Sequence, residues 1–146
     1  MTPTKHDTLI RWFKMTDIDA VLDIERRSFA MPWDLDDFGR VFVAPTVKCN
    51  VIENAGRVVG FMVYDLQKHH TDILNIAIHP EDRRCKFGSR LAMEWGGQWR
   101  KSIQAAVRET NVTAQLFFKH IGFRCTGISE RHFCNDEAAY LFEYRV

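Results

Sequence analysis

A strongly basic turn between an apolar run and a helical pattern is the part of this sequence best suited to chemistry. The β-branched run Ile73–Ile78 predicts a buried strand, and Gly88 opens a helical pattern after it. The turn between them carries three cations, Arg83, Arg84 and Lys86. The free N–H groups and positive dipole end of a helix N-terminus attract anions, and the cations add to this attraction. The pattern predicts a site for a phosphate or pyrophosphate, and hence an enzyme that uses a nucleotide-type cofactor.

Further strands and helices must hold this turn in place. Apolar runs predict strands over Leu9–Phe13, Val47–Ile52, Val58–Leu66, Ile103–Val107, Cys125–Ile128 and Ala138–Tyr144. Helical spacing predicts a helix from Thr16 or Asp17 to Phe29, a second from Asp34 to Val41, and a third over Asn111–Ile121 that Gly122 ends. These elements predict an α/β (α+β) fold, with a mixed sheet of six to seven strands and about four helices in one domain over residues 1–146.

The composition is that of an ordinary globular protein. Hydrophobic residues make up 46%, charged residues 27%, and the net charge is +1, so no electrostatic attraction to nucleic acid is expected. The cysteines show no CxxC spacing, which favours free thiols and predicts no metal site; they are Cys49, Cys85, Cys125 and Cys134. The sequence shows no apolar run of membrane-spanning length and no signal-peptide core, so we expect a cytoplasmic protein without a membrane partner.

Four motifs occur in one order along the chain, each on a predicted element. They are Ile24–Trp33, which includes Glu25 and Pro32-Trp33; Leu74–Pro80; Arg83–Gly88; and Asn111–Phe123, which includes Ala114 and Gly122-Phe123. With these motifs the chain resembles the GNAT acyltransferases, and it is most similar to the ribosomal-protein-alanine N-acetyltransferase branch. The resemblance implies a three-layer α-β-α arrangement, with acetyl-CoA as the cosubstrate and an amine as the acceptor.

The resemblance also implies which residues bind the two substrates. Backbone groups along Ile76, Ala77 and Ile78 would bind the pantetheine and the thioester carbonyl. Asn111 would hold the pantetheine arm, and Phe118 would lie near the sulfur. The pyrophosphate would be held by Arg83, Arg84, Cys85, Lys86, Phe87, Gly88 and Ser89. The acceptor pocket would be lined by Phe29, Pro32, Trp33 and Asn75.

Three residues depart from the family pattern near the chemistry. Lys86 replaces the first glycine of the phosphate loop, which matters if the turn needs a positive φ. Phe118 replaces the tyrosine that protonates the CoA thiolate, and Ala106 replaces a glutamate that serves as the base. The weak candidates for these roles are Glu25, Asp82 and His120, for which surface or packing roles are the alternative. The helix after Gly88 is also expected to end early, at Gly96-Gly97.

A missing base favours a weakly basic acceptor. An α-amine with a pKa of about 7.7–8.0 is ~10–20% neutral at pH 7, whereas a lysine with a pKa of about 10.4 is only ~0.04% neutral. We therefore expect a protein or peptide N-terminus as the acceptor. A small-molecule amine and a CoA-binding module that has lost catalysis stay open as alternatives. We expect a monomer or a loose dimer.

Overall fold

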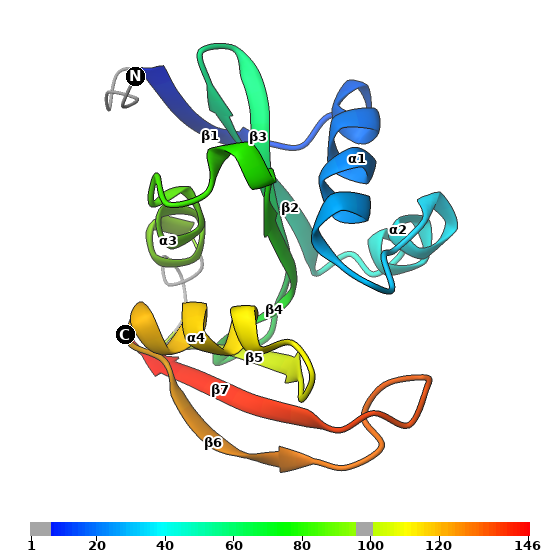
Figure 1. The fold of residues 1–146 in the computed structure, drawn as a ribbon, viewed down its shortest axis with the longest axis vertical. Helices are drawn as coiled ribbons and strands as arrows, with labels where there is room; N and C mark the ends of the chain where they lie inside the picture. The colour runs from blue at the N-terminus through cyan, green and yellow to red at the C-terminus, as the bar shows by residue number, and fades with distance from the viewer. Residues whose placement is uncertain (1–6, 96–100) are drawn as a thin grey trace.

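The computed structural model describes residues 7–95 and 101–146, and its strands form one seven-stranded sheet (Figure 1). The strands are β1 (Thr8–Trp12), β2 (Val47–Asn54), β3 (Arg57–Leu66), β4 (His70–Ile78), β5 (Ser102–Arg108), β6 (Arg124–Ser129) and β7 (Ala139–Arg145). Their order in the sheet is β1-β2-β3-β4-β5-β7-β6. Neighbouring strands run antiparallel except β4 and β5, which run parallel. The predicted mixed α/β fold is confirmed.

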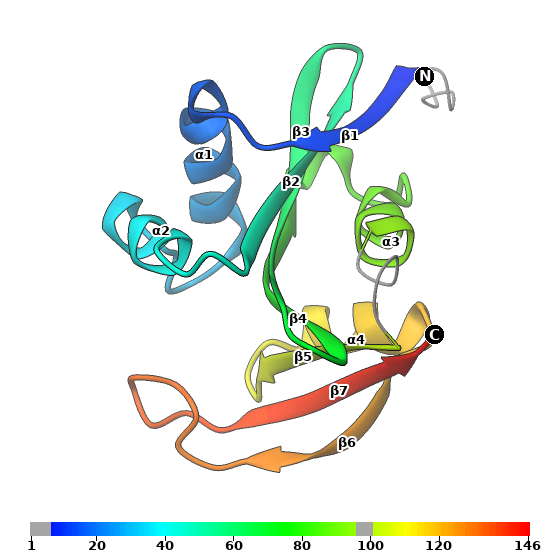
Figure 2. The same ribbon diagram turned by 180° about the vertical axis from the view of Figure 1, so that it is seen from behind.

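Helices cover both faces of this sheet. They are α1 (Ile18–Ser28), α2 (Leu35–Phe42), α3 (Phe87–Arg90) and α4 (Val112–His120), and a π-helical turn, Leu91–Trp95, continues α3. One apolar core joins α1 and α2 to β2–β4, and a second joins α3 and α4 to the opposite face (Figure 2). The three layers are those that the sequence predicted. Within the described ranges, no helix is both long enough and apolar enough to cross a membrane.

The ends of the helices follow local sequence signals. The Asp34 carboxylate accepts a hydrogen bond from the Asp37 N–H at 2.9 Å, and the Asp37 carboxylate accepts one from the Asp34 N–H at 2.9 Å. This reciprocal pair satisfies two backbone donors at the start of α2. Asn111 caps α4 in the same way, with its Oδ1 accepting from the Ala114 N–H at 3.1 Å. Gly122, at φ 104°, follows the end of α4 in the conformation expected of a terminating glycine.

The structure differs from the sequence prediction at the start of β4, which lies earlier in the chain than expected. The strand begins at His70 rather than Ile73, because Thr71 and Asp72 pair with both β3 and β5, and His70 pairs with β5, despite their polar side chains. Thr71, in this polar part, is fully buried. The predicted helix end at Gly96-Gly97 lies outside the described residues.

Candidate active site

The parallel strands β4 and β5 separate near the middle of the sheet. Their pairing covers only four positions, from His70 opposite Ser102 to Ile73 opposite Ala105. Beyond this point, the part of β4 up to Ile78 has no pairing with β5. Backbone groups on this edge of β4 are therefore free to pair with a ligand instead of a strand.

A bulge marks the point where the strands part. Val63 of β3 pairs with Asn75 and the next residue, Tyr64, pairs with Ile73, so Leu74 is the extra residue of β4. A bulge bends its strand and changes the face to which the following side chains point. Asn75 consequently reaches α1, whereas Ile76 packs in the core formed with α3 and α4.

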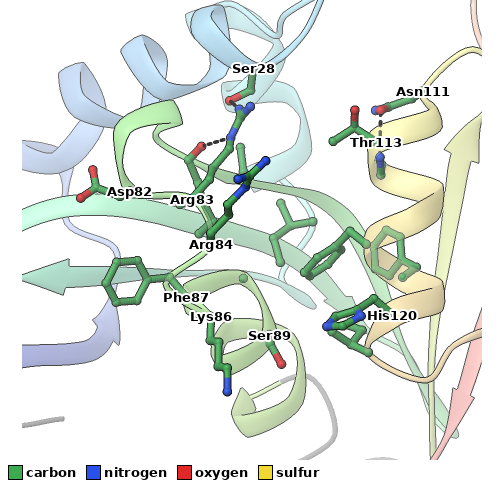
Figure 3. A pocket seen from close by; sticks show the side chains of 18 of the residues that line it. Ser28, Asp82, Arg83, Arg84, Lys86, Phe87, Ser89, Asn111, Thr113 and His120 are labelled. Carbon is green, nitrogen blue, oxygen red and sulfur yellow. Dashed lines mark hydrogen bonds between the residues drawn. The ribbon is translucent and has the colours of Figure 1, made fainter. Parts of the chain in front are cut away.

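A cleft of about 830 Å³ opens where the two strands separate (Figure 3). Its walls are the free part of β4, the basic turn before α3, and α4. It brings together all but one of the residues predicted to bind the cofactor: Ile76, Ala77, Ile78, Arg83, Arg84, Lys86, Phe87, Gly88, Ser89, Asn111 and Phe118. Cys85 does not line the cleft and is packed against the neighbouring core. The spatial grouping agrees with the sequence prediction, and the individual binding roles stay predictions.

The basic turn contains two residues with positive φ. Arg84 has φ 67° and Lys86 has φ 64°, a left-handed conformation that favours glycine. The side chain of Lys86 extends in the opposite direction from that of Arg84 (Figure 3). A Cβ atom built on Gly88 would lie 3.0 Å from the Phe117 ring of α4, so a glycine here lets the helix start approach α4 closely. The turn thus adopts a glycine-like path although a lysine stands at its first glycine position.

Arg83 already contacts the edge of β4. Its Nε donates to the Ile78 carbonyl oxygen at 3.1 Å, and its Nη2 donates to the Ser28 hydroxyl at 3.2 Å. A ligand that uses the Ile78 oxygen therefore takes its second lone pair or displaces this guanidinium. The Asn111 Oδ1 is similarly engaged as the cap of α4, while its Nδ2 group takes no part in that cap.

One face of α4 supplies cleft residues that the motif comparison did not single out. They are Thr113 and Phe117, with Ile121 just past the end of the helix, and Ser28 joins them from the end of α1. Spacings of three and four residues place the helical members on one side, which is a signal the sequence already carried. Phe118 is only 3% exposed and lies 5.0 Å from Phe123 and 6.0 Å from Phe142 between ring centroids. Its position in an aromatic cluster gives it a packing role as well as a place in the wall.

The four residues predicted to bind the acceptor do not line one common pocket. Phe29 lines the cleft, and Pro32 is exposed. The Trp33 ring packs edge-on against Phe38, with 5.1 Å between the ring centroids. Asn75 faces α1 and donates to Glu25. Of these four residues, only Phe29 contributes to the cleft.

Glu25 is a buried carboxylate that links three segments. It is 1% exposed, and its oxygens accept from the Trp33 N–H at 3.0 Å and from the Asn75 Nδ2 at 2.8 Å. Burial raises the pKa of Glu25 above its usual value, while the hydrogen bonds from Trp33 and Asn75 oppose the rise. Glu25 does not line the cleft.

The other two candidates for acid or base line the cleft. Asp82 is 8% exposed and receives two hydrogen bonds of 3.1 Å from Arg57, so it is held in an ion pair. His120 lies on the exposed surface at the end of α4. Among the residues that the structure describes, no group of three or more histidine, cysteine or acidic side chains is arranged to hold a metal ion.

A second, smaller pocket of about 360 Å³ lies where β4 and β5 part. It is lined by Leu74 and Ala106, with the polar residues Asp72, Gln104, Thr126, His132 and Glu143 around them. Because side chains alternate along a strand and Ala105 belongs to the core with α3 and α4, Ala106 points to the opposite face. The two pockets thus line adjacent stretches of β4, residues 76–78 and 72–74, on either side of Asn75.

Comparisons with known proteins agree with this geometry. A sequence model of the acetyltransferase (GNAT) family matches residues 18–123. A Bacillus subtilis protein provisionally named [ribosomal protein bS18]-alanine N-acetyltransferase is 30% identical, with 90% of this chain and 91% of that protein covered. The [ribosomal protein bS18]-alanine N-acetyltransferase of Haemophilus influenzae is 22% identical over 86% of this chain and 88% of its own length. The crystal structure of Ard1 from Thermoplasma volcanium superposes with a TM-score of 0.81 and 26% identity, covering 96% of this chain and 98% of that one.

Proposed function

The chain belongs to the acetyltransferase (GNAT) family and transfers an acetyl group from acetyl-CoA to an amine, and we propose that this amine is the N-terminal α-amine of a protein or peptide. The Bacillus subtilis relative, whose name specifies an alanine of a ribosomal protein, supports a protein as the acceptor. The two pockets support the reaction, because they line β4 on either side of Asn75 and offer separate sites for a donor and an acceptor.

In the proposed complex, acetyl-CoA occupies the larger cleft. Its pantetheine arm runs along the edge of β4 that β5 leaves free, where backbone groups near Ile76 pair with it. Its pyrophosphate lies at the basic turn, where Arg84 supplies positive charge. The thioester then reaches the bulge at Leu74, and the acceptor nitrogen attacks its carbonyl carbon from the smaller pocket. The amide forms as the carbon–sulfur bond breaks, CoA leaves as its thiolate, and the proton that the amine nitrogen loses passes to water or to that thiolate.

The observation that carries the choice of acceptor is the methyl group of Ala106 in the smaller pocket. The charged neighbours in that pocket are engaged: Glu143 accepts from Arg145 at 2.8 Å, and Asp72 lies 3.2 Å from the His70 ring. An amine that arrives already neutral needs no base, and an α-amine meets this condition about two to three orders of magnitude more often than a lysine at pH 7. The site therefore favours α-amines.

Peptide acetylation with mass-spectrometric localisation tests this proposal. The purified protein is incubated with acetyl-CoA and a peptide that begins with alanine and contains one lysine. We expect acetylation at the N-terminus and little at the lysine. The matched control is the same peptide with its N-terminus blocked, which should remain unmodified.

Two other outcomes would contradict the proposed acceptor. Modification of the lysine alone would assign the enzyme to a different class of amine. Calorimetric binding of acetyl-CoA without turnover of any peptide or small amine would indicate a binding module. The absence of a nucleic-acid partner, the cytoplasmic location and the monomer or loose dimer stay predictions from the sequence.

A further inference from the structure

A buried carboxylate on α1 joins the loop after that helix to the bulge of β4, and it lines neither pocket. Glu25, on α1, is 1% exposed, and its two oxygens each accept one hydrogen bond. One comes from the backbone N–H of Trp33, eight residues along the chain, and the other from the amide of Asn75, fifty residues along the chain. A buried charge with two donors of this kind is held firmly, because losing either bond leaves it unsatisfied.

The Asn75 bond depends on the bulge of β4. Asn75 immediately follows the extra residue Leu74, and Ala77 lies two positions further on in the core that α1 forms. Without the extra residue, the alternation of the strand would turn Asn75 to the other face. The bond to Glu25 thus favours the bulged register over the regular one. The bulge in turn is where β4 parts from β5.

The Trp33 bond anchors the loop between α1 and α2. The Trp33 ring packs against Phe38 in the core, and the loop passes from there back to Phe29, which lines the cleft. Between these two contacts, Met31 and Pro32 are exposed. The hydrogen bond from the Trp33 N–H to Glu25 therefore connects an otherwise exposed loop to the framework of α1 and β4.

We propose that Glu25 is a positioning residue for acetyl transfer, which clamps the Phe29–Trp33 loop to the β4 bulge and so fixes Leu74, in the wall of the smaller pocket, relative to the strand edge. This role rests on the proposed function only in taking the smaller pocket as the acceptor site. It differs from a role as general base, because both carboxylate oxygens are occupied and the group is shielded from both pockets. It assigns a shared partner to two residues, Trp33 and Asn75, that were predicted separately as acceptor-binding.

Two substitutions of Glu25 test its two hydrogen bonds and its negative charge separately. Glu25→Leu removes both acceptor oxygens and leaves the Trp33 N–H and the Asn75 amide without their partner. Glu25→Gln removes the charge but keeps both bonds, since its oxygen accepts from the Trp33 N–H and its amide donates to the Asn75 oxygen once the Asn75 amide turns over. Asp23→Asn is the matched control, because it removes a carboxylate from the same helix whose partners are the exposed arginines Arg26 and Arg27.

The variants are compared with the wild type in acceptor KM, kcat and the Kd for acetyl-CoA, with the best peptide acceptor of the wild type. We expect Glu25→Leu to raise the acceptor KM at least tenfold while the Kd for acetyl-CoA changes less than threefold. Glu25→Gln should keep an acceptor KM within about threefold of the wild type, and Asp23→Asn should match the wild type. Hydrogen exchange provides a readout that needs no acceptor: exchange should rise together in the loop 29–33 and at residues 74–75 in Glu25→Leu, and stay close to the wild type in Glu25→Gln.

Several results would overturn the proposal. One is a folded Glu25→Leu protein whose acceptor KM and hydrogen exchange match those of the wild type. Another is a loss of kcat at unchanged KM in Glu25→Gln, which would indicate proton transfer by Glu25. If Glu25→Leu does not fold, Asn75→Ala replaces it and must show the same rise in acceptor KM and in exchange. A wild type that acetylates no peptide would refute the proposed acceptor, whereas the hydrogen-exchange comparison would still decide the clamp.

Discussion

The left-handed conformation of Lys86 leads to a prediction that separates backbone strain from charge. Lys86 has φ 64° immediately before α3, at a position where a side chain costs about 1–2 kcal/mol. Replacement by glycine removes this cost but adds about 0.5–1 kcal/mol of chain entropy in the unfolded state. Lys86→Gly should therefore raise the free energy of unfolding by about 1 kcal/mol or less, which corresponds to a rise in Tm of up to ~2–4 °C.

The matched control is Lys86→Ala, which removes the same charge but keeps a Cβ atom. We expect this variant to show no rise in Tm, so that the difference between glycine and alanine measures the strain less the chain entropy of glycine. Differential scanning calorimetry of the three proteins in one buffer provides the comparison. A glycine variant less stable than the alanine variant by the full entropy cost of about 0.5–1 kcal/mol would refute the assignment of strain to this position.

The same variants test the contribution of the lysine to acetyl-CoA binding. The Lys86 side chain is exposed and extends away from Arg84 (Figure 3), so its charge should contribute about 0.2–1 kcal/mol, as exposed pairs do. Both variants should then bind acetyl-CoA up to about fivefold more weakly in low salt, with a smaller difference at high ionic strength. Isothermal titration calorimetry measures the Kd. Binding by Lys86→Gly that is more than tenfold tighter, about 1.4 kcal/mol, would instead show that the lysine obstructs the native loop.

Three further substitutions test separate parts of the structure. Asp34→Ala removes a capping hydrogen bond from α2 and should lower the free energy of unfolding by about 1 kcal/mol, measured by urea denaturation; an unchanged midpoint would contradict the cap. The bonds from Thr110 and Arg108 lower the pKa of Glu137 to about 2, so its stabilisation is present above about pH 4.5 and is lost as the pH falls towards 2. Glu137→Gln should therefore flatten the stability profile in that range, and a profile parallel to the wild type would exclude this role. Ala106→Glu places a carboxylate in the smaller pocket and should raise kcat/KM more for lysine peptides than for α-amines, by up to ~10²-fold; an equal gain for both would refute the argument from the missing base.

The sequence predicted the parts of the fold that depend on neighbours along the chain. The start of α2 at Asp34 and the end of α4 at Gly122 follow from hydrogen bonds and backbone angles within a few residues. The strand, basic turn and helix around Arg83–Gly88 were recognised for the same reason. The positive φ at Lys86 shows that the turn takes the left-handed conformation although a lysine stands at this position.

The arrangement of the candidate site was predictable only in part. The motifs named most residues that line the cleft, but they missed the Phe117 face of α4, although its helical spacing is visible in the sequence. They also grouped Trp33 with the acceptor wall, whereas its ring packs against Phe38 in the core. An aromatic side chain in a loop fits either role, and its direction depends on the cavity that the rest of the chain leaves beside it.

The sequence by itself determined the elements, their capping and the cationic turn, because these arise from interactions among residues close in the chain. Only the tertiary structure decided where β4 leaves β5 and which way Asn75 points. The bulge at Leu74 is a matter of register between β3 and β4, and the Glu25–Asn75 bond joins residues fifty positions apart. Such features depend on a balance of pairing and packing across separate segments, which a linear pattern of apolar and polar residues does not encode.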